Sequence, residues 1–150
     1  MKILDFKKID AFTKGSSSGN PAGYVLLERM DSLSEGEMQK LASELKGFVS
    51  EVGFACREDG GFHLKYYSSE CEVAFCGHAT IAIMYDLIST DPGLISEKEL
   101  KIRVRAGILP VFNRLREEDA VYITAPEPQF LQRDISRNEI AEALGCDIKA

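Results

Sequence analysis

The segment 78–89 constrains the fold more than any other, because it would be apolar on every face of a helix. Its apolar side chains are Ala79, Ile81, Ala82, Ile83, Met84, Tyr85, Leu87 and Ile88. A helix that is apolar all round is either buried on all sides within a protein or crosses a membrane. Crossing a bilayer takes about 20 residues, and this segment is shorter. We therefore expect a central helix that other elements of the chain wrap, and no membrane span.

The rest of the chain supplies strands that can wrap such a helix. Strand character is found in the segments 7–12, 24–27, 49–56, 62–67, 100–105, 108–114 and 120–125. Residues 13–21 give a dense turn and loop signal, and Asp59-Gly60-Gly61 is typical of a hairpin turn. Two further helices are predicted at capping boxes, one formed by Ser34 with Glu37 and one by Ser136 with Glu139.

These elements predict the fold class. Strands that follow one another through short turns, without strict alternation with helices, favour antiparallel pairing over a parallel sheet. We expect an α+β fold in which mostly antiparallel strands form a barrel-like sheet around one buried central helix. The 150 residues fit a single domain, since domains commonly have about 100–200 residues.

Charge and cysteine content exclude several classes of protein. The net charge of -6 leaves no basic cluster for phosphates, so we expect no nucleic-acid partner. The charged N-terminal residues 1–10 do not resemble a secretory signal, and the four cysteines form no C-x-x-C pair. We therefore expect a cytoplasmic protein without disulfides, and neither a metal nor a cofactor.

Three stretches could carry chemistry. Gly19-Asn20-Pro21-Ala22-Gly23, taken alone, is a plain loop. Glu51 follows Ser50 at the start of an apolar strand, and two interpretations of its side chain stay open. It either alternates outward to water or is a carboxylate with a raised pKa that shuttles a proton. The third stretch, Cys76-Gly77-His78, stands at the start of the expected central helix.

The start of that helix is the most informative of the three. The first backbone N–H groups of a helix lack intrahelical acceptors and the helix dipole is positive there, so the site can hold a carboxylate. Gly77 would let a ligand approach the backbone, and His78 could donate a hydrogen bond or move a proton. Cys76 could be a thiolate nucleophile or base, because a helix N-terminus lowers the pKa of a thiol. The same residues could equally be a turn, a satisfied polar group and a small buried hydrophobe.

Several motifs occur in a fixed order along the chain. They are Ile9-Asp10-Ala11-Phe12-Thr13, Gly19-Asn20-Pro21-Ala22, Met38-Gln39, Ala42-Ser43-Glu44, Ser50-Glu51-Val52-Gly53-Phe54, Glu72-Val73, Cys76-Gly77-His78-Ala79-Thr80 and Pro126-Glu127-Pro128. The pentapeptide that begins at Cys76 is specific, and the ordered set is more so. In this order the chain resembles the phenazine biosynthesis-like (PhzF-type) isomerase family.

The resemblance implies a diaminopimelate epimerase-like fold, in which two similar lobes each wrap a central helix and the active site lies between them. It implies that Glu51 is catalytic and moves protons on a small cyclic or amino-acid-like substrate. It further implies that Asn20, Ser50, Gly77 and His78 contact that substrate. Residues 1–150 would then be a single N-terminal lobe, about half of the family's usual length, with the second lobe absent.

The expected function is therefore a proton-transfer isomerase, of which this chain supplies half the active site. Two alternatives stay open. One is a cysteine-based epimerase or racemase, because related epimerases carry a basic cysteine at the place of Cys76. The other is a non-catalytic half-enzyme that acts as a binding or assembly module. Besides a small-molecule substrate, we expect a homodimer or a second chain to supply the other lobe, since a lone lobe should expose an apolar wall.

Overall fold

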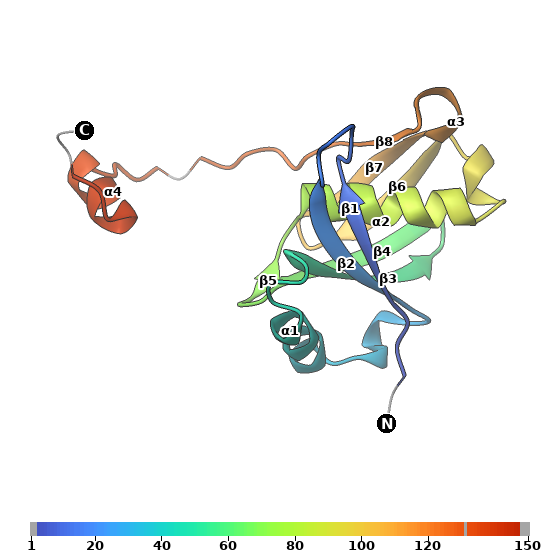
Figure 1. The fold of residues 1–150 in the computed structure, drawn as a ribbon, viewed down its shortest axis with the longest axis horizontal. Helices are drawn as coiled ribbons and strands as arrows, with labels where there is room; N and C mark the ends of the chain where they lie inside the picture. Colours follow the sequence, from blue (N-terminus) through green and yellow to red (C-terminus); the bar gives the residue numbers. More distant parts are fainter. Residues whose placement is uncertain (1–2, 131, 148–150) are drawn as a thin grey trace.

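The apolar segment forms the central helix of the protein. The computed structural model describes residues 3–130 and 132–147, and in it helix α2 (Gly77–Thr90) runs through a curled sheet (Figure 1). The side chains of Ala79, Ile83, Met84 and Ile88 are fully buried, although they point to different sides of the helix. The expectation of a buried central helix is confirmed.

Eight strands make up one sheet, in the order β1-β2-β3-β4-β6-β7-β8, with β5 paired to β4 beside this path. The strands are β1 (Phe6–Ala11), β2 (Asn20–Leu27), β3 (Glu51–Glu58), β4 (Gly61–Ser68), β5 (Glu72–Val73), β6 (Glu99–Val104), β7 (Gly107–Arg114) and β8 (Ala120–Ile123). Five of the strand pairs are antiparallel, which confirms the predicted α+β class with mostly antiparallel strands.

Helices carry the chain across the two parallel pairs, β2 with β3 and β4 with β6. A parallel pair needs a crossover rather than a hairpin turn. The first crossover contains the short helix η1 (Met30–Ser32) and helix α1 (Glu35–Glu44), and the second contains α2 and η2 (Leu94–Ser96). The remaining helices are α3 (Leu115–Glu118) and α4 (Arg137–Leu144).

The sheet is covered on both faces where β3 passes between α1 and α2. Phe54 belongs to an outer core that includes Met38 of α1, whereas Ala55 belongs to the inner core around α2. Gly53 also faces α2, because a Cβ atom at this position would lie 2.3 Å from Cδ1 of Ile83. Successive residues of β3 therefore point alternately to two different cores, as the pleat of a strand requires.

The predicted capping boxes are present in the structure. The Ser34 hydroxyl accepts a hydrogen bond from the backbone N–H of Glu37, and the Glu37 carboxylate accepts one from the backbone N–H of Ser34. The same reciprocal pair joins Ser136 and Glu139 at the start of α4. Helix α4 lies apart from the sheet, at the end of an extended segment (Figure 1).

The structure corrects the predicted loop at residues 13–21, because β2 already begins at Asn20. Asn20 pairs with Ala11 of β1, and Pro21 pairs with Asp10. The proline is tolerated at this end of the strand, where its carbonyl accepts the backbone N–H of Ser50 at 3.1 Å. The short elements η1, η2, α3 and β5 were also missed, since a few residues carry too little periodicity to be recognised.

Within the described residues, no helix combines the length and the apolar character needed to cross a membrane.

Burial around α2 predicts a large stability difference between two neighbouring isoleucines. Replacing the fully buried Ile83 by alanine should lower the free energy of unfolding by about 2–5 kcal/mol, because a cavity is left in the inner core. Ile81 is only partly buried on the same helix, so Ile81→Ala should cost clearly less. Urea unfolding of both variants measures the difference. Equal losses would contradict the orientation of α2.

Candidate active site

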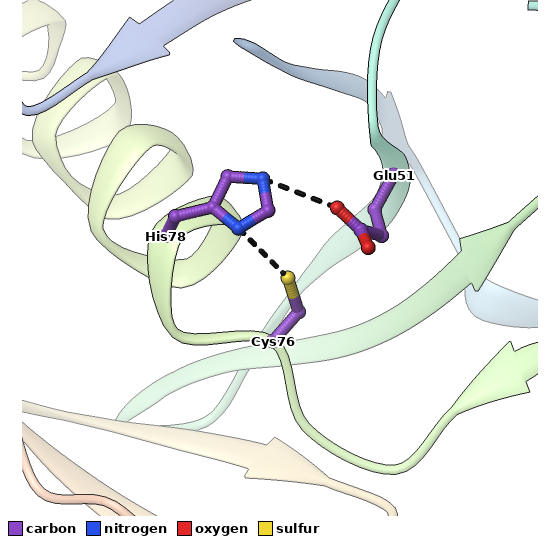
Figure 2. Close-up of side chains that lie close together, drawn as sticks. All are labelled: Glu51, Cys76 and His78. Carbon is purple, nitrogen blue, oxygen red and sulfur yellow. Dashed lines mark hydrogen bonds and ion pairs between the residues drawn. The ribbon is translucent and has the colours of Figure 1, made fainter. Parts of the chain in front are cut away.

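Three side chains from different parts of the sequence meet at the N-terminus of α2. Glu51 is the first residue of β3, Cys76 is the N-cap of α2, and His78 is the second residue of that helix. His78 Nε2 lies 3.2 Å from Oε2 of Glu51, and Cys76 Sγ lies 3.3 Å from Nδ1 of His78 (Figure 2). The ligand atoms of the three side chains lie within 4.8 Å of one another, so they form one compact cluster.

The pleat of β3 explains the direction of Glu51. Glu51, Gly53 and Ala55 share the strand face that looks toward α2, whereas Val52 and Phe54 face the outer core. The Glu51 side chain is 22% exposed and the His78 side chain 13% exposed. Of the two interpretations of Glu51, the outward-pointing one is therefore wrong.

The two facing atoms are buried but poorly matched as hydrogen-bond partners. Glu51 Oε2 and His78 Nε2 both lack a well-directed hydrogen bond to any described residue, despite their separation of 3.2 Å. Leaving a buried polar group without such a bond costs about 1–3 kcal/mol, so most native proteins avoid it. An orphaned pair of this kind is typical of a site that completes its hydrogen bonds with a ligand.

The sequence-predicted ligand residues lie around this pair. Gly77 is the first residue of α2, and the nearest atom to a Cβ built on it is 3.9 Å away, in the ring of Phe75. The space beside its backbone is therefore open to a ligand. Asn20 and Ser50 stand at the starts of the neighbouring strands β2 and β3, and the Ser50 hydroxyl donates to Oδ1 of Asn20 at 3.2 Å.

A buried hydroxyl network under the helix start was missed by sequence reasoning. Thr80 is fully buried, and its hydroxyl donates to the carbonyl of Cys76 at 2.6 Å. The Tyr66 hydroxyl of β4 lies 2.6 Å from the Thr80 oxygen. Because the Thr80 proton is already committed, Tyr66 donates and Thr80 accepts. Thr80 is the last residue of the Cys-Gly-His-Ala-Thr motif, so the motif could have identified it. No sequence motif pointed to Tyr66.

The Cys76 thiol is not activated in the way that its place on the helix predicted. Burial raises the pKa of Cys76 to about 11, and the negative charge of Glu51 and a hydrogen bond to its carboxylate add to the rise. The backbone N–H of Ala79 acts in the opposite direction but is outweighed. At pH 7 only about one thiol in ten thousand would be ionised. Of the two interpretations of Cys76, the raised pKa favours the small buried hydrophobe over the activated thiolate.

Within the part of the chain that the structure describes, two groups of side chains could hold a metal ion. The ligand atoms of Glu51, Cys76 and His78 lie within 4.8 Å of one another, and a second group consists of Cys56, Glu58 and His63. A metal binds the thiolate, which the raised pKa of Cys76 disfavours. In the second group the Glu58 carboxylate is held by the guanidinium of Arg103. Neither donor set is poised for a metal, and the expectation of a metal-free site stays a prediction.

Two large grooves of the protein lie away from the Glu51 cluster. One groove of about 670 Å³ lies between β1, α2 and β8, and another of about 690 Å³ lies outside β4 and β6. The first is lined mainly by apolar groups. In the second, Lys65, Arg103 and Arg105 are each paired with a glutamate. Among the described residues, buried side-chain atoms without a hydrogen-bond partner occur at Glu51 and His78, and also at His63 and Tyr67. Glu51 and His78 are the two of these that face each other at the start of a helix.

The sequence and the fold are similar to those of known proteins. Residues 9–150 match the family described as phenazine biosynthesis-like protein (PhzC-PhzF). The uncharacterized isomerase YfhB of Bacillus subtilis is 39% identical over 97% of this chain and 48% of its own length. A crystal structure of the Bacillus anthracis phenazine biosynthesis protein of the PhzF family is 34% identical. It matches with a TM-score of 0.66 over 82% of this chain and 40% of that one.

The chain thus belongs to the phenazine biosynthesis-like family, which confirms the resemblance seen in its motifs. The structure of a Pseudomonas aeruginosa protein described as a predicted epimerase is only 18% identical, and its TM-score of 0.55 shows a shared fold. The expected epimerase-like fold is confirmed. The chain spans about half the length of the curated relative YfhB.

Removing the Thr80 hydroxyl should cost more stability than removing the Tyr66 hydroxyl. Thr80→Val leaves the buried Tyr66 hydroxyl without an acceptor and should lower the free energy of unfolding by about 1–3 kcal/mol. Tyr66→Phe leaves no buried donor without an acceptor, so it should lower the free energy of unfolding by only about 0.5–1.5 kcal/mol. The double variant should lose less unfolding free energy than the two single variants lose together, and urea unfolding measures all three losses. Additive losses would contradict the network.

Removing the charge of Glu51 should lower the pKa of Cys76. The carboxylate disfavours a second negative charge beside it, so Glu51→Gln should bring the thiol pKa below about 11. Thiolate absorbance during a pH titration measures this in a background where Cys56, Cys71 and Cys146 are replaced by alanine or serine. Glu58→Gln, at the far end of β3, is the matched control and should leave the Cys76 pKa unchanged. An unchanged pKa in Glu51→Gln would place the carboxylate away from the thiol.

Proposed function

We propose that this chain supplies one half of the active site of a proton-transfer isomerase, with Glu51 as the acid and base. The observation that carries the proposal is the buried contact of the Glu51 carboxylate with His78 at the N-terminus of α2. Membership of a family with curated isomerases supports the same reaction class. The substrate is a small cyclic or amino-acid-like molecule.

The chemistry follows from the two oxygens of the carboxylate. One oxygen faces His78, and the other is available to take a proton from a carbon of the substrate. Glu51 then carries that proton and returns it to another carbon, so that the substrate is isomerised and the enzyme is regenerated. A substrate carboxylate or carbonyl binds at Gly77 and His78, where the helix dipole and free N–H groups favour negative charge. Asn20 and Ser50 complete this wall.

A second lobe is part of the proposal. General acid–base catalysis on a small substrate needs groups on both sides and the exclusion of water. Large apolar side chains after the sheet are exposed, namely Phe130, Ile135, Ile140 and Leu144. Their exposure supports a contact with another lobe, which either a longer protein, a second chain or a second copy of this chain provides. We also propose a cytoplasmic location and activity without metal or cofactor.

The cysteine-based alternative is weaker. Cys76 lies at the site, but a thiol with a pKa of about 11 is a poor source of thiolate at neutral pH. The two mechanisms differ for Cys76→Ser, because serine cannot replace a cysteine base. The alternative requires this variant to be as inactive as Glu51→Gln, whereas the proposed mechanism lets it keep measurable turnover. In the non-catalytic alternative, every variant and the parent chain would lack turnover.

Glu51→Gln should reduce turnover by at least about 10²–10⁴-fold while leaving the unfolding transition in place, because the amide cannot accept the proton. The assay follows deuterium uptake from D₂O into a panel of small cyclic and amino-acid-like carboxylates, with the second lobe supplied in trans or as a fusion. Glu58→Gln on the same strand is the control and should retain the parent's rate. Full exchange in Glu51→Gln would sink the assignment of Glu51.

A further inference from the structure

The Cys76 thiol has no role in the proposed reaction, yet it makes a specific contact. Its sulfur lies 3.3 Å from Nδ1 of His78, and the ligand atoms of Cys76, His78 and Glu51 all lie within 4.8 Å of one another (Figure 2). Cys76 is 8% exposed, so water competes little for this contact. The two ring nitrogens of His78 therefore have different neighbours, a thiol at Nδ1 and a carboxylate at Nε2.

These neighbours distinguish the two neutral forms of the imidazole. With its proton on Nδ1, the ring would turn the lone pair of Nε2 toward the Glu51 carboxylate, and the two would repel. With its proton on Nε2, the ring places N–H beside the carboxylate, although not in a well-directed hydrogen bond, and a lone pair beside the sulfur. A protonated thiol can then donate S–H to Nδ1. The tautomer of a histidine is commonly set by the partner of its other nitrogen.

We propose that Cys76 is a positioning residue, whose S–H donates to Nδ1 and keeps the proton of neutral His78 on Nε2, facing Glu51. The burial that keeps the thiol protonated also maintains its donor role. Cys76 thus acts through His78 and does not itself touch the substrate.

This role rests on the proposed function for its consequence, although its geometry does not depend on it. With the proton on Nε2, the imidazole presents a donor rather than a lone pair to the residue that we propose moves the substrate proton.

The tautomer can be measured directly in the 150-residue chain without substrate. Long-range ¹H–¹⁵N correlation spectra at pH 8, where an ordinary imidazole is neutral, separate the two ring nitrogens and identify the protonated one. His78→Gln assigns the His78 signals by their loss, and the His63 signals serve as an internal control. We expect a single Nε2–H form in the parent chain. Cys76→Ala should give a mixture of tautomers, and Cys76→Ser, which keeps a donor, should restore the single form.

Two results would overturn the proposal: an Nδ1–H form in the parent chain, or an unchanged Nε2–H form in Cys76→Ala. Unchanged His63 signals show that each variant is folded, and if Cys76→Ala fails to fold, Cys76→Ser decides through the same spectrum. Loss of the Nε2–H form in Cys76→Ser would then contradict the donor role. Failure of the proposed function is a separate outcome, since it is seen in the turnover of Glu51→Gln and not in the tautomer.

Discussion

Burial of α2 is the constraint on which the rest of the structure depends. A helix with apolar side chains on all sides is stable in water only when it is enclosed, and the curled sheet provides that enclosure. The crossover through α2 also separates β4 from β6 in the sequence, and so makes their parallel pairing possible. One segment thus sets both the core and part of the strand order.

The same enclosure creates the candidate site at the start of the helix. The N-terminus of α2 stands where β3 begins, so the unpaired N–H groups of the helix and the first side chain of the strand share one place. Glu51 lies close to His78 because the pleat of β3 directs its side chain to the face that packs against α2, the same face as Gly53 and Ala55. Under the helix start, the Tyr66–Thr80 hydrogen bond fixes the carbonyl of Cys76.

Burial also divides the chemical roles among the three side chains. Desolvation and the neighbouring Glu51 carboxylate raise the pKa of the Cys76 thiol, and the backbone N–H of Ala79 does not offset them. A protonated thiol can donate a hydrogen bond but cannot serve as a base, which favours the carboxylate as the acid and base in the proposed reaction. The chain spans about half the length of the curated relative YfhB.

The sequence by itself determined the buried helix, both capping boxes, most strands and the family, because these depend on local periodicity and on short ordered motifs. It could not determine the direction of Glu51. Residues 52–56 are buried on both faces of β3, between α1 and α2, so the alternation that normally separates inside from outside is lost. Only the tertiary structure decided that Glu51 faces His78, that Tyr66 supports Thr80, and that Cys76 is buried beside Glu51. Each of these depends on distances between residues that are remote in sequence.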